Sequence, residues 1–195
     1  MEYTDLDLKI VNKALSKLGV REIASISDDE EAARVADSVY ETTRDFELST
    51  YQWAFAIKRD SLTADEATPA FGFNFQYSLP EDFLRLEGIY NPGGFDRDAY
   101  EIEGNKILTD IQGPLLIRYL TNDISDLNWP PYFTEALACR LAYEMCERLK
   151  QDPQRKNLLM QEYQLVIASA KRANAIQLAI KRPLPAPWEV AHDGD

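Results

Sequence analysis

The sequence predicts an α+β fold that is mainly α: an up-and-down bundle of four main helices, with a small β-sheet or hairpin element inserted and an extended C-terminal arm. Three observations predict it. Apolar residues recur at helical spacing in two stretches before residue 50 and two after residue 130. Between them, apolar and polar residues alternate with the period of a strand. The last residues place proline at alternate positions, which favours an extended chain.

The first predicted helix covers about 5–18. Thr4 is placed to cap its N-terminus, and Asp5 and Asp7 fall in the first turn, where the helix dipole favours acids. Gly19 follows the last apolar residue and ends the helix.

The second predicted helix covers about 28–48. Ser27 and Glu30 have the spacing of a capping box, in which each side chain satisfies a free backbone N–H. Because a short loop joins the two helices, we expect them to form an antiparallel hairpin.

The β insertion is predicted over about 53–120. Trp53, Phe55 and Ile57 alternate with smaller or polar residues, and residues 71–79 repeat this pattern. Gly104-Asn105 has the composition of a tight turn between two short strands.

Two further helices are predicted over about 131–150 and 153–181. Proline stands at the first position of each, where it is tolerated because no helical hydrogen bond is lost. The second would be roughly 43 Å long at about 1.5 Å per residue. A helix of that length in a small protein favours a role at an interface.

These elements form one predicted domain over residues 1–182, followed by an extended arm over 183–195. Pro183, Pro185 and Pro187 keep the arm extended, and Trp188 offers a large apolar side chain to a partner pocket. We therefore treat these four residues as a hypothetical partner-binding segment. The alternative is a disordered end without function.

Composition limits the partners. The 195 residues include 33 Asp and Glu against 21 Lys and Arg, a net charge of −12. Strong nucleic-acid binding needs clustered basic residues, and an anionic membrane would repel the chain.

Cys139 and Cys146 lie about two helical turns apart, too far for a disulfide. No secretory signal or membrane-spanning segment is recognisable, so we expect synthesis in a cytoplasm.

The sequence predicts no catalytic, cofactor-binding or metal-binding residue. His192 is the only histidine and falls near the end of the chain, which excludes the common histidine-based mechanisms. The densest acidic run, residues 28–31, is best explained as the start of a helix. The aromatic residues between 53 and 83 are expected to form the core of the sheet, with base or sugar stacking as the alternative.

Many short segments, taken in order, resemble a known family. They are Val11-Asn12-Lys13-Ala14-Leu15, Leu18-Gly19, Ile23, Ile26, Asp28-Asp29, Glu31-Ala32-Ala33-Arg34, Arg44-Asp45, Trp53-Ala54-Phe55-Ala56-Ile57-Lys58-Arg59, Leu62, Tyr77-Ser78-Leu79-Pro80-Glu81-Asp82, Leu84-Arg85, Ile117-Arg118-Tyr119, Asp123, Phe133, Ala136-Leu137-Ala138 and Arg140-Leu141-Ala142. Together they cover most of residues 8–175 and are similar to the tail tubular protein A, or head-to-tail adaptor, family of short-tailed bacteriophages (podoviruses).

The resemblance implies a structural virion protein of the neck and tail, made in the host cytoplasm. Its partners would be the portal protein and the tail tube or nozzle protein. It would form a ring of about twelve subunits, lining the channel through which genomic DNA leaves without specific binding. The free chain could be monomeric until it meets the portal. By the same resemblance, residues 183–195 would be an arm that holds the portal or a neighbouring subunit.

Two other functions stay open at the level of sequence. One is a tail-associated peptidoglycan hydrolase, which would need a cleft that holds two carboxylates in different environments. The other is an acidic assembly factor that does not enter the finished virion.

Overall fold

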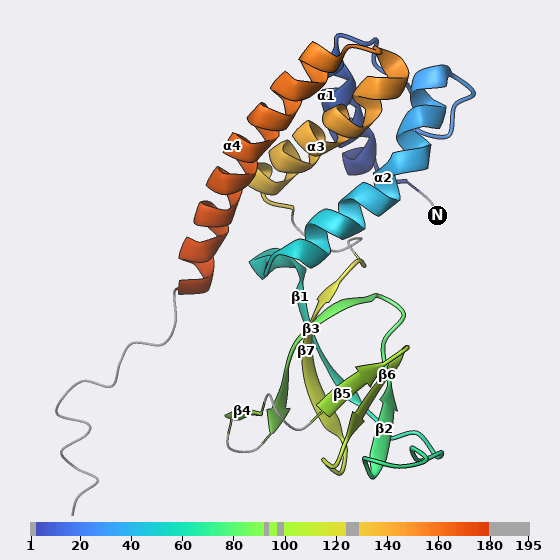
Figure 1. The fold of residues 1–195 in the computed structure, drawn as a ribbon, viewed down its shortest axis with the longest axis vertical. Helices are drawn as coiled ribbons and strands as arrows, with labels where there is room; N and C mark the ends of the chain where they lie inside the picture. The colour runs from blue at the N-terminus through green and yellow to red at the C-terminus, as the bar shows by residue number, and fades with distance from the viewer. Residues whose placement is uncertain (1–2, 92–93, 97–99, 124–128, 180–195) are drawn as a thin grey trace, which may run out of the picture.

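The computed structural model describes residues 3–91, 94–96, 100–123 and 129–179. The chain folds into two lobes, which we name by their content (Figure 1). The helical lobe contains four α-helices from both ends of the chain. The β lobe, formed by the middle of the chain, lies beyond one end of the helices.

In the helical lobe, α3 packs against each of the other helices. The lobe consists of α1 (Asp5–Leu18), α2 (Glu31–Thr50), α3 (Pro131–Leu149) and α4 (Pro153–Ala179). The four helices begin and end close to the positions expected from apolar spacing. However, α1 and α2 pack mainly on α3 and make little contact with each other, so the expected hairpin of the first two helices is wrong.

Local sequence predicts the N-terminal cap of α1 correctly and that of α2 incorrectly. Thr4 and Asp7 form a capping box on α1, with the Asp7 N–H donating to Thr4 Oγ1 at 3.2 Å. The predicted box between Ser27 and Glu30 is absent. Instead α2 begins at Glu31 without a side-chain cap. Asp28 accepts from the Ser25 N–H at 2.8 Å, which fixes the turn before the helix.

The β lobe spans the residues expected for the insertion but forms two sheets, so the fold-class prediction of a mainly α bundle with one small sheet or hairpin is wrong. Among the described residues, seven strands form two antiparallel sheets. One contains β1 (Ile57–Leu62), β7 (Leu115–Thr121), β3 (Phe83–Asn91) and β4 (Gly94–Asp96), and the other contains β2 (Phe75–Ser78), β6 (Lys106–Thr109) and β5 (Tyr100–Glu103). The predicted turn at residues 104–105 joins β5 to β6. The error arose because β1 and β7 pair across more than fifty residues, which no local pattern reveals.

Each lobe has its own apolar core. In the β lobe, Tyr77, Ile107 and Ile117 are buried between the sheets. Trp53 belongs to the helical core, where its ring lies 4.9 Å from that of Phe133. The segment from Ala54 to Ala56 is a short 3₁₀ helix, η1, and the first strand begins only at Ile57. The early aromatic residues are therefore part of the junction between the lobes and not of a sheet core.

Candidate assembly surfaces

The outer side of α4 exposes three large apolar side chains. Leu158, Leu165 and Ile176 are 65%, 73% and 69% exposed. Their spacings of seven and eleven residues are close to two and three helical turns, so the three side chains form one line along the helix. We call this line the α4 outer stripe. In Figure 1, α4 lies along one flank of the lobe, with α3 between it and α2.

The inner side of α4 is fixed by apolar and polar contacts. Leu159, Ile167 and Ala170 are buried against the helical core. Near the end of α4, the buried Asn174 donates to the Gln52 carbonyl at 2.7 Å and accepts from the Ala54 N–H at 2.8 Å. Because these bonds reach the link between the lobes, the rotation of α4 is set and its outer stripe is held outward.

A second feature is the groove between α2 and α3. Phe46 is about half exposed there and lies against Arg140, whose guanidinium is 5.3 Å from the ring centroid. The other walls of this groove, which has a volume of about 260 Å³, are formed by Val39, Thr42, Thr43 and Glu144. Its mixture of an aromatic ring, an arginine and methyl groups is typical of a protein-binding surface.

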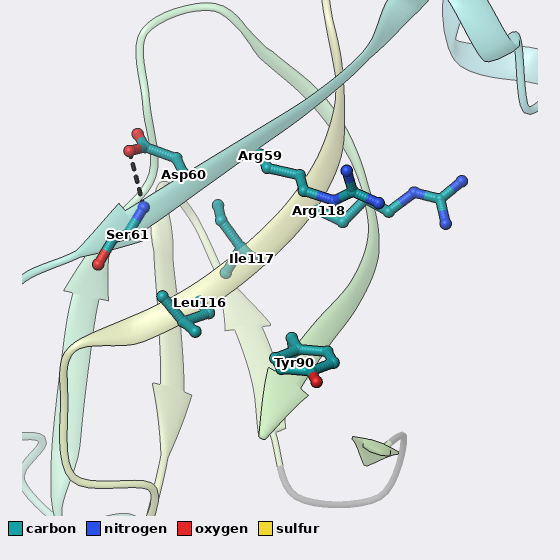
Figure 2. Close-up of a pocket in the computed structure, with 7 residues that line it drawn as sticks. All are labelled: Arg59, Asp60, Ser61, Tyr90, Leu116, Ile117 and Arg118. Carbon is teal, nitrogen blue, oxygen red and sulfur yellow. Dashed lines mark hydrogen bonds between the residues drawn. The ribbon is translucent and has the colours of Figure 1, made fainter. Parts of the chain in front are cut away.

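The third feature is a hollow on the open face of the four-stranded sheet, shown in Figure 2. Its volume is about 720 Å³, within the range of small-ligand and peptide pockets. Strand register places two rows of side chains across it. Arg59 and Arg118 form the first row, and Ser61, Leu116 and Tyr90 form the second. Cationic side chains thus lie directly beside exposed apolar ones.

A group of possible metal ligands is present between α3 and α4, but a lysine already occupies its centre. Atoms of Glu135, Cys139 and Glu162 lie within 4.8 Å of one another. Lys17 Nζ is 2.8 Å from Glu135 and 2.6 Å from Glu162, and Lys13 also pairs with Glu135, so two ammonium groups balance the two carboxylates. Burial raises the pKa of the Cys139 thiol to about 11, which keeps it protonated. This geometry is that of a structural ion pair.

The two cysteines are both buried and unbonded, as their separation on one helix predicts. The hypothetical binding residues Pro183, Pro185, Pro187 and Trp188 lie outside the described residues, as does His192. Sequence inspection missed the α4 outer stripe, although its spacing is visible in the sequence. It also missed the row formed by Arg59 and Arg118, called the arginine row below, which depends on the pairing of distant strands.

Among the described helices, none combines the length and hydropathy of a membrane span.

Comparison with known proteins leaves the resemblance to phage adaptors as a hypothesis. No family model and no curated protein matches the chain.

Proposed function

We propose that this protein is a structural virion component, the head-to-tail adaptor that joins the portal of a short-tailed phage to its tail. The α4 outer stripe carries the proposal. Fully burying one Leu or Ile side chain contributes about 1.5–3 kcal/mol, so three in one line provide a strong contact for a neighbouring subunit. Nothing else in the described helical lobe covers them.

The arrangement of the two helical surfaces supports a ring. The α4 outer stripe consists of residues of α4, and the α2–α3 groove is lined by residues of α2 and α3, so the two surfaces are different parts of the subunit. If the stripe of one subunit packs into the groove of the next, the contact is head-to-tail. Contacts of this kind repeat around an axis and form a ring when the rotation closes. The two lobes would then project differently from that ring, one toward the portal and one toward the tail.

The proposal is tested by the mass of the assembly, measured by light scattering before and after mixing with portal rings from the same phage. We expect the chain to load onto the portal as a many-subunit ring. Leu165→Glu should reduce loading at least tenfold, because it places a charge in the apolar contact. Gln164→Glu adds the same charge at an exposed site on the same helix, about 100° around the helix axis from Leu165 and off the stripe, and should load normally.

A chain that never associates with portal rings, or a Leu165→Glu variant that loads like the native chain, would contradict the adaptor role. In the first case, release of peptidoglycan fragments and the protein content of purified virions would be the next measurements. Both variants should keep the native thermal unfolding temperature, because neither site contributes to the core.

A further inference from the structure

The arginine row on the open face of the four-stranded sheet is electrostatically unbalanced. Arg59 and Arg118 are directly opposite partners on β1 and β7. Like charges at such positions repel and destabilise a sheet. Among the described residues, neither guanidinium has a carboxylate or a hydrogen-bond partner, and Arg118 Nε is buried without an acceptor. Figure 2 shows the two side chains extending in the same direction.

The nearest acid does not correct this imbalance. Asp60 lies at the edge of the hollow, but its carboxylate accepts from the Ser61 N–H at 2.7 Å and points away from the arginines (Figure 2). Elsewhere the chain pairs cations locally, as in Arg85 with Glu87 and Lys106 with Asp65. Two unpaired arginines side by side in a chain of net charge −12 therefore indicate an anionic ligand.

The second row of the hollow gives the ligand an apolar part. Leu116 and Tyr90 are 38% and 53% exposed. Arginine and tyrosine, with tryptophan, are enriched at the energetic centres of protein interfaces. The site therefore fits a peptide in which a large apolar side chain stands next to a carboxylate. A nucleic-acid backbone fits less well, because the acidic chain as a whole repels a polyanion.

We propose that this hollow binds the C-terminal segment of the same chain, with Trp188 over Leu116 and Tyr90 and the Glu189 carboxylate between the two arginines. In this sequence Trp188 is followed directly by Glu189, and Asp193 and Asp195 add further acids. A tryptophan side chain buries about 150–250 Å², and guanidinium forks bind a carboxylate through paired hydrogen bonds. The sheet face and the tail thus complement each other in charge and polarity.

The length of the chain permits this contact. Asn174 is hydrogen-bonded to residues 52 and 54, so α4 is anchored a few residues before β1. Arg59 follows Ala54 by five residues, a span of at most about 17 Å. The helix continues for roughly 7.5 Å beyond Asn174. From Ala179 to Trp188 an extended proline-containing chain covers about 28 Å at roughly 3.1 Å per residue, which is enough to reach the arginine row.

The test uses the full-length chain and the solvent accessibility of Trp188, since Trp53 and Trp129 are buried. Acrylamide quenching of the native chain is compared with that of Trp188→Phe, and the difference reports Trp188 alone. We expect Trp188 to be protected. Arg59→Glu and Glu189→Arg should each raise its quenching about threefold or more. The exchange Arg59→Glu with Glu189→Arg should restore the protection, because the opposite charges are again paired.

Arg21→Glu is the matched control: it removes the same charge from an exposed arginine away from the hollow and should leave quenching unchanged. Free quenching of Trp188 in the native chain would overturn the proposal. So would protection that neither charge reversal affects. An added thymidine oligonucleotide that binds through Arg59 while Trp188 stays exposed would assign the site to phosphate instead. All readings are made on the free chain, so they do not depend on the adaptor role.

Discussion

Glu47 is a carboxylate that the fold buries where three helices meet. Its side chain is 2% exposed. Tyr163 of α4 donates to Glu47 Oε1 at 2.7 Å, and Arg140 of α3 lies 3.8 Å from the same atom. Burial raises the pKa of Glu47 above its ordinary value of 4.5, with a smaller rise from Glu144, while Tyr163, Arg140 and Lys171 oppose the rise. The negative charge is thus only partly compensated in the folded state.

This raised pKa predicts a pH-dependent effect of Glu47→Gln. The folded chain binds the Glu47 proton more readily than the unfolded chain, so the stability it contributes is present at low pH and lost as the pH rises through the folded pKa. Gln keeps an acceptor for Tyr163 and carries no charge. The free energy of unfolding of Glu47→Gln, relative to the native chain, should therefore increase between about pH 4 and about pH 7.

Urea unfolding at several pH values measures this difference, with Glu66→Gln at an exposed site as the control. If the difference between Glu47→Gln and the native chain stays constant across the range, the assignment of a raised pKa to Glu47 is incorrect.

At the scale of the elements, the buried polar residue Asn174 ties α4 to the rest of the fold. Asn174 is fully buried, and its two hydrogen bonds join the helix to the link between the lobes. Asn174→Ala removes both bonds and leaves a backbone N–H and a carbonyl without partners. Each bond contributes about 1 kcal/mol, so we expect a loss of about 2 kcal/mol in the free energy of unfolding.

Asn157 offers the matched comparison, because it is exposed on the same helix. Asn157→Ala should change stability by less than about 0.5 kcal/mol. The free energies of unfolding of both variants, measured in urea, test this difference. Equal effects of the two substitutions would show that the contacts of Asn174 do not anchor the helix.

The boundaries of the helices and strands show how much of the fold local sequence predicts. Apolar spacing placed α1, α3 and α4 within two residues of their observed ends, because each helix buries one continuous face. It misplaced the start of α2, because Ser27 has the residue type of a cap but its chain forms a turn. Trp53 and Phe55 alternate like strand residues, yet they pack on Phe133 of a distant helix. Tertiary packing overrode the local pattern there.

At the scale of the whole molecule, the pairing of strands that are distant in the sequence sets which side chains are neighbours on the sheet face. The register of β1 on β7 places Arg59 opposite Arg118, and the register of β3 on β7 adds Tyr90. No spacing in the sequence reveals either neighbour. The α4 outer stripe differs, because its residues lie on one helix. It was overlooked because the opposite side of α4 is also apolar, so the helix has no single polar face.

The acidic charge and the α4 outer stripe together predict how salt affects self-association. Subunits of net charge −12 repel one another, and that repulsion is screened when the Debye length falls from about 10 Å at 0.1 M salt to about 3 Å at 1 M. Apolar contacts through Leu158, Leu165 and Ile176 are not weakened by salt. The weight-average mass of the concentrated native chain in sedimentation should therefore rise with NaCl. Leu165→Glu should stay monomeric throughout. A native mass that falls with salt would mean that ion pairs, and not the stripe, hold the subunits together.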